Sequence, residues 1–281
     1  MSKHTKIWLI IAVLLIVTGG ILLSATLVGA HRSSSNEFEE KVYTIDTEFE
    51  NILVDAKTAA VSIHLSTDTL CHITCYEDIN APIFVKAENN TLTVQEVDET
   101  AWYAHIGIRL THPRIEISVP RKALNSLDIR TSTGDIVLNN HTMNSLTLSA
   151  TTGDIRLNDV ICQGNAQIQL STGSVNLSNV VCQEFTTEGS TGDVRLSNTV
   201  ILGLLSIRRS TGSIHLEKSD GGEIFIKTST GDITCSLLTD KVYTAHTNTG
   251  HINVPKTTGS GKCEVTTNTG DIKITVHSQT H

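Results

Sequence analysis

The chain contains few positively charged residues. Its 281 residues include 21 lysines and arginines against 29 aspartates and glutamates, a net charge of −8. All 29 acidic residues but only 19 of the basic ones lie beyond residue 30, so this part carries ten more negative than positive charges. Binding to nucleic acid or anionic lipid usually requires a basic patch. We therefore expect no nucleic-acid partner.

Motifs for catalysis and metal binding are missing as well. The segment Cys71-His72-x-x-Cys75 resembles half of a zinc site, but no second half with suitable spacing follows. The serines and histidines show no nucleophile motif. We expect no enzymatic activity, no cofactor and no bound metal, and a carbohydrate-active enzyme is the weakest of the alternatives, to be tested on wall glycans.

A repeat dominates what the chain does contain. Eight Thr-Gly pairs share one context: each follows Ser, Thr or Asn, a single residue separates its glycine from an Ile or Val, and successive glycines are 19 or 20 residues apart. A fixed period of this length is typical of a solenoid, in which each repeat stacks on its neighbours. The repeated residues are Thr133, Gly134, Thr152, Gly153, Thr172, Gly173, Thr191, Gly192, Thr211, Gly212, Thr230, Gly231, Thr249, Gly250, Thr269 and Gly270.

Alternation within the unit predicts strands and corners. Apolar residues lie two apart on both sides of each Thr-Gly pair, as in half-buried strands. The apolar residues lie at even positions of the repeat before the glycine and at odd positions after it. One continuous strand cannot change the face of its apolar side chains in this way, so the chain must turn there, with glycine at positive φ. A second corner is expected at turn-forming residues, and a short third strand such as Val160–Cys162 should follow it. These corner residues are Asn140, Asp159, Asn179 and Asn198.

Together these features predict an all-β fold. We expect a parallel β-solenoid (β-helix), right-handed, of about eight to nine coils of 19–20 residues. The leucine-rich repeat has a similar period, but it requires Leu-x-x-Leu-x-Leu followed by Asn and a helical return segment, which these units do not match. Eight of the coils account for residues 126–281.

Residues 44–125 depart from this regularity. The stretch 51–63 fits the repeat with Thr58 kept and Ala59 in the glycine position, which predicts a degenerate first coil. Alternating segments follow in residues 66–120, and we expect them to form hairpins that cap the N-terminal end of the solenoid, where a strand edge would otherwise be exposed. These segments are 71–76, 83–87, 91–97 and 114–119.

A long uncharged run lies near the N-terminus. Residues 7–30 carry no charge, and a membrane span needs about 20 apolar residues. Lys3 and Lys6 precede the run, so we expect residues 1–6 in the cytoplasm, a single transmembrane helix at 7–30, a tether at 31–43 and the bulk of the chain outside the cell membrane. A signal peptide cleaved after Ala30 is the alternative.

Two rows of residues at the glycine corner have alternative interpretations. The residue after glycine is usually Asp, which suggests either a calcium-binding edge or aspartates that cap the turn. Only Asp135 and Asp154 are acidic in consecutive coils, and this favours turn capping. The Thr residues at the corner suggest an ordered hydroxyl surface, but the second Thr of such a surface is interrupted by Leu170, Gly189 and Arg209, so a structural hydroxyl row is the better interpretation.

Six cysteines raise the question of disulfides. Cys162 and Cys182 occupy the same position one coil apart, within the Cα separation that a disulfide spans, and the spacing leaves their state open. Cys235 and Cys263 lie at apolar positions and are interpreted as small buried hydrophobic residues.

The anchor, the tether, the segment from about Tyr43 to Pro120 and the serial Thr-Gly-Asp-Ile units resemble the bacterial putative-adhesin family of β-strand repeat proteins. The resemblance covers roughly residues 43–276. It implies an extracytoplasmic β-helix-like domain of a kind common in Firmicutes, with adhesion or envelope stress sensing proposed for relatives. The family has no established catalytic residues, so it implies none here.

We therefore expect a membrane-anchored, non-catalytic, adhesin-like binding or scaffold protein of the cell envelope, whose partner is a protein or glycan of the envelope. The alternative is an envelope stress sensor or modulator that recruits a membrane partner. Trp102 and Tyr103, within the insertion that caps the array, are the aromatic candidates for ligand contact, although a place in the core of the cap is their more common role.

Overall fold

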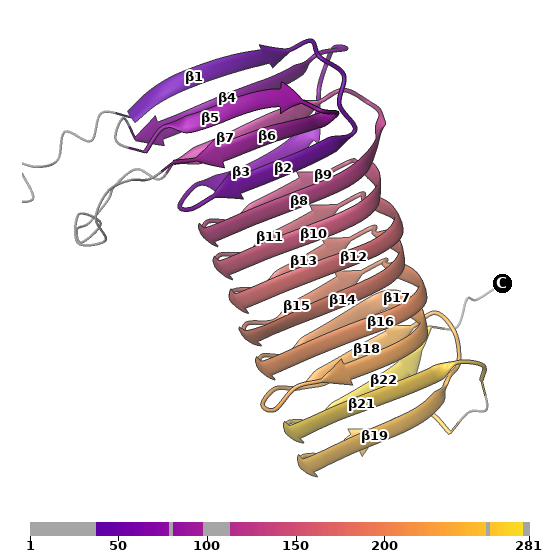
Figure 1. Cartoon of the computed structure of the whole chain (residues 1–281). Helices are drawn as coiled ribbons and strands as arrows, with labels where there is room; N and C mark the ends of the chain where they lie inside the picture. Colours follow the sequence, from indigo (N-terminus) through magenta and orange to yellow (C-terminus); the bar gives the residue numbers. More distant parts are fainter. Residues whose placement is uncertain (1–37, 79–80, 98–112, 257–258, 278–281) are drawn as a thin grey trace, which may run out of the picture.

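The computed structural model describes residues 38–78, 81–97, 113–256 and 259–277. All regular structure in these residues is β, which confirms the predicted all-β class, and the strands form a long parallel solenoid (Figure 1). Among the residues described, no helix is long and apolar enough to cross a membrane. The expected anchor at 7–30 lies outside them.

Two sheets face each other across the core. Sheet B contains the long strands of each repeat. Its members, in spatial order, are β5 (Ile83–Glu88), β6 (Thr91–Glu96), β2 (Asn51–Ala56), β8 (Ala123–Thr133), β10 (Thr142–Thr152), β12 (Ile161–Thr172), β14 (Val181–Thr191), β16 (Val200–Thr211), the second half of β17 (Ile214–Lys227), β21 (Lys262–Thr269) and β19 (Val242–Thr249).

Sheet A contains the short strands that follow the glycine corner. Its members, in spatial order, are β1 (Phe38–Ile45), β4 (Cys71–Asp78), β7 (Arg114–Val119), β3 (Ala60–Leu65), β9 (Ile136–Asn139), β11 (Ile155–Asn158), β13 (Val175–Ser178), β15 (Val194–Ser197), the first half of β17, β18 (Ile233–Leu237), β22 (Ile272–Val276) and β20 (Ile252–Asn253).

The regular turns of the solenoid have two corners, where residues adopt a positive φ. Glycine occupies the first corner, with φ of 127° at Gly192 and 144° at Gly212. The second corner is an Asn or Asp in the left-handed region, with φ of 58° at Asn140 and 55° at Asp159, and in β17 it is Lys218, with φ of 47°. Asn and Asp tolerate this conformation better than other residues that carry a Cβ.

The short third strand that we expected beyond the second corner is not separate. Cys162 lies inside β12, which starts at Ile161, and a β-bulge between Cys162 and Asn165 lets the long strand follow the curve of the stack. Bulges bend a strand without ending it. Each repeat is therefore one long strand and one short strand.

Aliphatic side chains form one continuous core between the sheets. In each turn the alternating residues that face inward are fully buried, as with Leu148 and Ile168 in sheet B and Leu157 and Val175 in sheet A. The only large aromatic side chain that is fully buried among the described residues is Phe185. Since one repeat buries too little area to offset the entropy of ordering it, the stacking of turns stabilises the fold.

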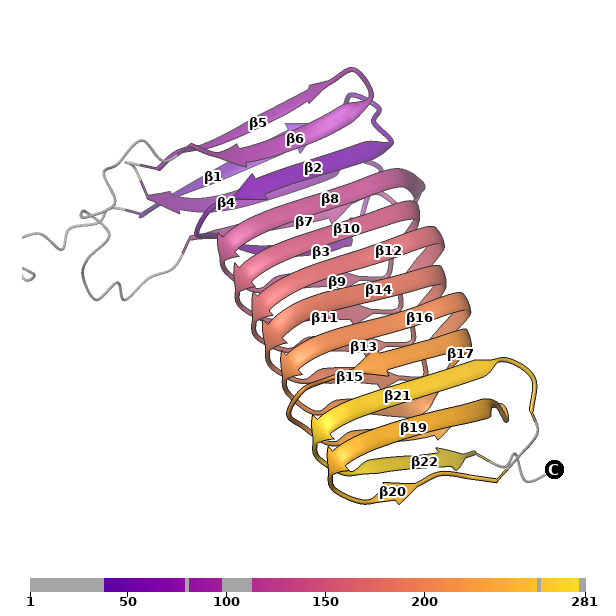
Figure 2. The same ribbon diagram turned by 60° about the horizontal axis from the view of Figure 1, so that its bottom comes forward.

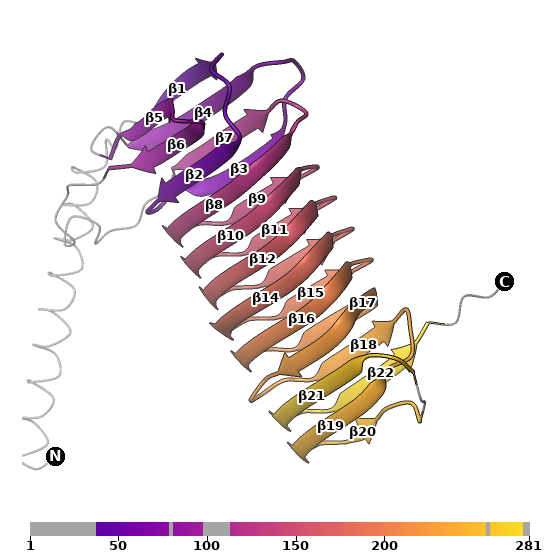
Figure 3. The same ribbon diagram turned by 45° about the vertical axis from the view of Figure 1, so that its right-hand side comes forward.

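About seven turns follow one another in sequence order, from β2–β3 to β17–β18, where eight to nine coils were expected (Figure 3). The stretch 51–63 lies directly on the turn that starts at β8. Outside it lie β6 and β7, which pair in parallel with β2 and β3. The antiparallel strands β5, β4 and β1 close this end.

The last two repeats continue the parallel stack, but they do not follow sequence order. The final repeat, β21–β22, pairs with β17 and β18, and the preceding repeat, β19–β20, lies outside it (Figure 2). Backbone bonds show the same order, since Gly231 N donates to Thr269 O at 2.9 Å and Gly270 N donates to Thr249 O at 2.9 Å. The end of the chain is thus inserted between two earlier segments.

Candidate binding surfaces

The Thr-Gly pairs form a structural corner along one side of the solenoid. In every repeat but the outermost, the N–H of the corner glycine donates to the carbonyl oxygen of the Thr in the next turn, as from Gly173 to Thr191 at 2.9 Å. A Cβ on Gly192 would lie 2.0 Å from the carbonyl oxygen of Gly173. Glycine is therefore required here both for its positive φ and for the close approach of the neighbouring backbone.

The aspartates after the glycines bind the backbone of the next turn. Asp135 Oδ1 accepts the N–H of Asp154 at 2.8 Å, and Asp154 Oδ1 accepts the N–H of Ser174 at 2.9 Å. The second oxygen of each of these two carboxylates pairs with Arg156, at 2.9 and 2.6 Å. The same bond joins Asp193 to Ser213. The carboxylates thus cap the turns, as the spacing had favoured.

These bonds also affect ionisation. Burial alone would raise the pKa of Asp135 and Asp193, but in each case the backbone N–H that the carboxylate accepts and its arginine neighbour outweigh burial and lower the pKa. In the residues that the structure describes, no group of three His, Cys, Asp or Glu side chains is placed to hold a metal ion.

One inward position at the glycine corner contains a feature that the sequence analysis missed. At this position Thr131 and Thr228 donate their hydroxyl groups to backbone carbonyl oxygens of the corner. In the repeat of β16 the same position is occupied by Arg209, which is only 4% exposed. Its Nη1 donates to Leu170 O at 2.9 Å, two turns away, through the space that Gly189 leaves free. Burial lowers the pKa of the Arg209 guanidinium to about 10. The sequence contained a sign of this contact, because a glycine, Gly189, and a large residue, Arg209, occupy the same position in consecutive repeats.

All six cysteines are buried free thiols. Cys162 and Cys182 lie side by side in neighbouring strands, as their spacing suggested, but they are not bonded. Burial raises the pKa of Cys71 to about 11 and of Cys75 to about 12. Cys235 and Cys263 occupy core positions, as expected of small hydrophobic residues.

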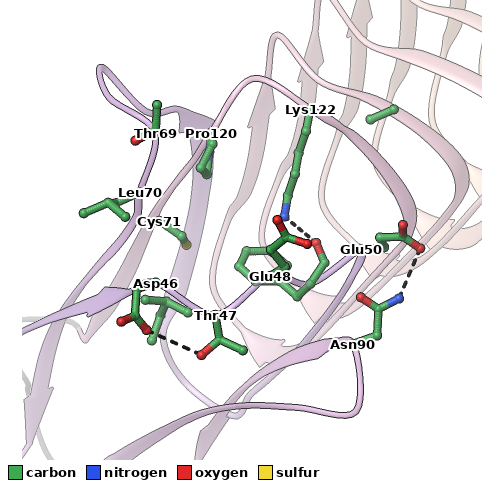
Figure 4. A pocket seen from close by; sticks show the side chains of 13 residues that line it. Asp46, Thr47, Glu48, Glu50, Thr69, Leu70, Cys71, Asn90, Pro120 and Lys122 are labelled. Carbon is green, nitrogen blue, oxygen red and sulfur yellow. Dashed lines mark hydrogen bonds between the residues drawn. The ribbon is translucent and has the colours of Figure 1, made fainter.

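A hollow lies at the N-terminal end, where four connections meet (Figure 4). Its volume is about 380 Å³. The connection from β1 to β2 contributes Asp46, Glu48 and Glu50, whose side chains are exposed. Opposite them, Lys122 donates to Phe49 O and lies 3.9 Å from the centre of the Phe49 ring. We call this hollow, lined by residues of 45–50, 69–71, Asn90 and 120–123, the cap pocket.

The chemistry of the cap pocket favours binding over catalysis. Its rim has three carboxylates and one amine, a set that attracts cationic or hydrogen-bonding groups. No histidine is among the described lining residues, and the thiol of Cys71 is buried with a raised pKa. Trp102 and Tyr103, the aromatic candidates, lie outside the described residues.

A second hollow of about 230 Å³ lies on the outer face of sheet B. Arg208 covers the ring of Phe225 at 4.7 Å, and Leu204 is 39% exposed beside them. Along the rest of this face, most outward positions are polar, as with Gln169 and Glu188. The face offers many similar contacts spread over several turns, as in other solenoids that bind through extended surfaces.

Comparison with known proteins identifies relatives of the chain. A family model described as Toastrack DUF4097 matches residues 49–279. None of the curated proteins compared with the chain is similar to it in sequence.

Solved structures of similar architecture include a putative adhesin from Bacteroides fragilis, with 19% identity and a TM-score of 0.47 over 86% of this chain and 98% of that one. A putative cell adhesion protein from Clostridium sporogenes has 12% identity and a TM-score of 0.39, covering 86% of this chain and 100% of its own. A putative lipid binding protein from Parabacteroides distasonis has 14% identity and a TM-score of 0.31, covering 84% and 97%.

Proposed function

We propose that this chain, which belongs to the Toastrack DUF4097 family, is a non-catalytic binding or scaffold protein of the cell envelope. In this proposal residues 7–30 anchor it in the membrane, and the solenoid displays the cap pocket and the outer face of sheet B outside the cell. The uncharged run after Lys3 and Lys6 is what supports the anchored orientation.

One observation carries the proposal: the polar residues of the stack are used for structure, and the pronounced local irregularity is the cap pocket. The corner aspartates and glycines bond to the next turn, so they hold the stack together and leave little for a partner to bind. Specific recognition needs a feature that is not repeated. The three exposed carboxylates at the cap pocket provide one, and they favour a partner with cationic groups, from a protein or an amino-bearing glycan.

Binding to envelope material tests this proposal. The full-length chain in mild detergent would be incubated with envelope fractions, and the retained amount compared for Glu48→Lys, which reverses a charge in the cap pocket, and Glu184→Lys, which makes the same change at an exposed position of β14. We expect the first variant to lose at least about tenfold in affinity and the second to retain it.

Two outcomes would contradict the proposal. Equal loss in both variants would show that overall charge governs binding and that the cap pocket has no special part. Release of a soluble form starting at His31 would contradict the anchor. Circular dichroism establishes that each variant is folded, so that loss of binding is not loss of structure.

A further inference from the structure

The C-terminal end of the solenoid is an open edge. Among the described residues, β19 pairs only with β21 and β20 pairs only with β22, so the outer edge of each strand has no neighbour (Figure 2). Backbone N–H and C=O groups along such an edge are available for pairing with another strand. Proteins commonly protect an edge of this kind with charges or proline.

This edge has none of those protections. Residues 242–254, from Val242 to Val254, contain no Asp, Glu, Lys, Arg or Pro, in a chain whose net charge is −8. At the opposite end, the outer strands are charged: β1 carries Glu39, Glu40 and Lys41, and β5 carries Lys86 and Glu88. The charged N-terminal edge therefore opposes pairing with another strand, whereas the uncharged C-terminal edge permits it.

The core is also incompletely covered at the C-terminal end. Ile252 occupies the first core position after the glycine, which is at most 1% exposed in the other repeats, as at Ile233 and Ile272, whereas Ile252 is 45% exposed. The inward side chains Tyr243 and Val254 are only partly buried. A terminal repeat with a polar outer surface normally closes a solenoid, and the described residues include no such repeat at this end.

We propose that this edge pairs with the same edge of a second copy of the chain, giving an end-to-end dimer. A twofold axis normal to the sheets places β19 antiparallel to its copy, so that sheets A and B each continue into the partner. Identical strands are complementary in this arrangement because they exchange the same backbone bonds. The absence of charge removes the repulsion that two acidic chains would otherwise meet, and the exposed Ile252 side chains become covered.

Cysteine placed near the twofold axis tests the pairing directly. His246 is exposed near the middle of β19, and Gln169 occupies the equivalent position in β12, an inner strand. The variants Thr244→Cys, His246→Cys and Asn248→Cys cover the central outward positions of β19, and Gln169→Cys is the control. Because the native thiols are buried, diamide should cross-link mainly the new cysteines. We expect a disulfide-linked dimer from at least one β19 variant and none from the control.

Charge variants test the same contact without cross-linking. The full-length chain in mild detergent should sediment as a dimer at about 100 μM, and His246→Lys should weaken the dimer at least about tenfold by placing like charges together. Mixing His246→Lys with His246→Glu should restore it, whereas Gln169→Lys should have no effect. A monomer at all concentrations, a dimer insensitive to both His246 variants, or the absence of every cross-link in β19 would overturn the proposal.

Discussion

The two ends of the solenoid solve the same physical problem differently. At the N-terminal end, the strand direction reverses, and the antiparallel strands β5, β4 and β1 place charged residues on the outer edge. At the C-terminal end, the parallel direction continues to the last strand, and the chain only changes the order in which its repeats are stacked. Charged outer strands discourage the approach of a further strand, whereas an uncharged outer repeat leaves an edge on which another strand fits.

The cap also provides bonds that a regular turn would obtain from its neighbour. Ala59 replaces glycine in the turn formed by β2 and β3, and the corner is held from outside by Glu96, which is 2% exposed. Its carboxylate accepts the N–H and the hydroxyl group of Thr58, each at 2.7 Å, and the N–H of Ala59 at 3.3 Å. One buried side chain thus replaces the repeat pattern at this end.

The largest effect is expected from a corner glycine between the two ends. Gly192→Val introduces a Cβ where the carbonyl oxygen of Gly173 lies, at a φ of 127°, and should lower the free energy of unfolding by about 4 kcal/mol or more. Gly250→Val makes the same change in the outermost turn and should detach only β19–β20. Thermal melts combined with hydrogen exchange would distinguish unfolding of the whole solenoid from detachment of β19–β20 alone. Equal melting temperatures for the two variants would contradict the expected difference between them.

A buried ion pair at the C-terminal end should come next. Lys241 Nζ lies 3.0 Å from Asp220 Oδ1, and the side chains are 6% and 9% exposed. Lys241→Met leaves the Asp220 carboxylate buried without this cation and should cost about 3 kcal/mol. The control Lys262→Met removes an exposed pair with Glu264 and should cost less than about 1 kcal/mol. Chemical denaturation measures both, and similar costs would contradict the difference in burial.

A smaller loss is expected at the N-terminal end. Glu96→Gln keeps the shape of the side chain but removes the charge that strengthens its bonds to Thr58 and Ala59, and it should cost about 2 kcal/mol. Glu88→Gln, on the exposed strand β5, is the control and should change stability little. If protection of β2 and β3 amides from exchange is unchanged in Glu96→Gln, Glu96 does not hold this corner.

The smallest effect concerns pH. Burial lowers the pKa of His141 below its usual 6.5, with nearby His64 acting in the same direction against the carbonyl of Asn139. The unfolded chain then binds a proton more readily than the folded one, so stability present above about pH 6.5 declines as the pH falls through that value towards the lowered pKa. His141→Val, which introduces the residue found at Val160 one turn later, should remove this part of the decline in melts between pH 7 and pH 5.

Much of the corner geometry was predictable, because it depends on residues close together in the chain. Gly192 at one corner and Asn179 at the other are residue types that readily adopt a positive φ. The apolar alternation also shifts by one residue at the glycine, which requires a turn there. Arg209 was not predictable in the same way. Its environment depends on Gly189 and Leu170, which lie in the two preceding turns. Only the stacked structure shows that the guanidinium fills the space beside Gly189 and bonds to the carbonyl oxygen of Leu170.

By itself, the sequence determined the period, the parallel strands, the corners and the apolar positions of the core. It also placed the irregular segment before residue 126. Each of these follows from local preference and from alternation within about 20 residues. Only the tertiary structure decided the order of the last two repeats, the pairing of β6 and β7 outside the first turn, and the exposure of Ile252. Repeats that are nearly equivalent can stack on one another in more than one order, and the choice depends on contacts between distant parts of the chain.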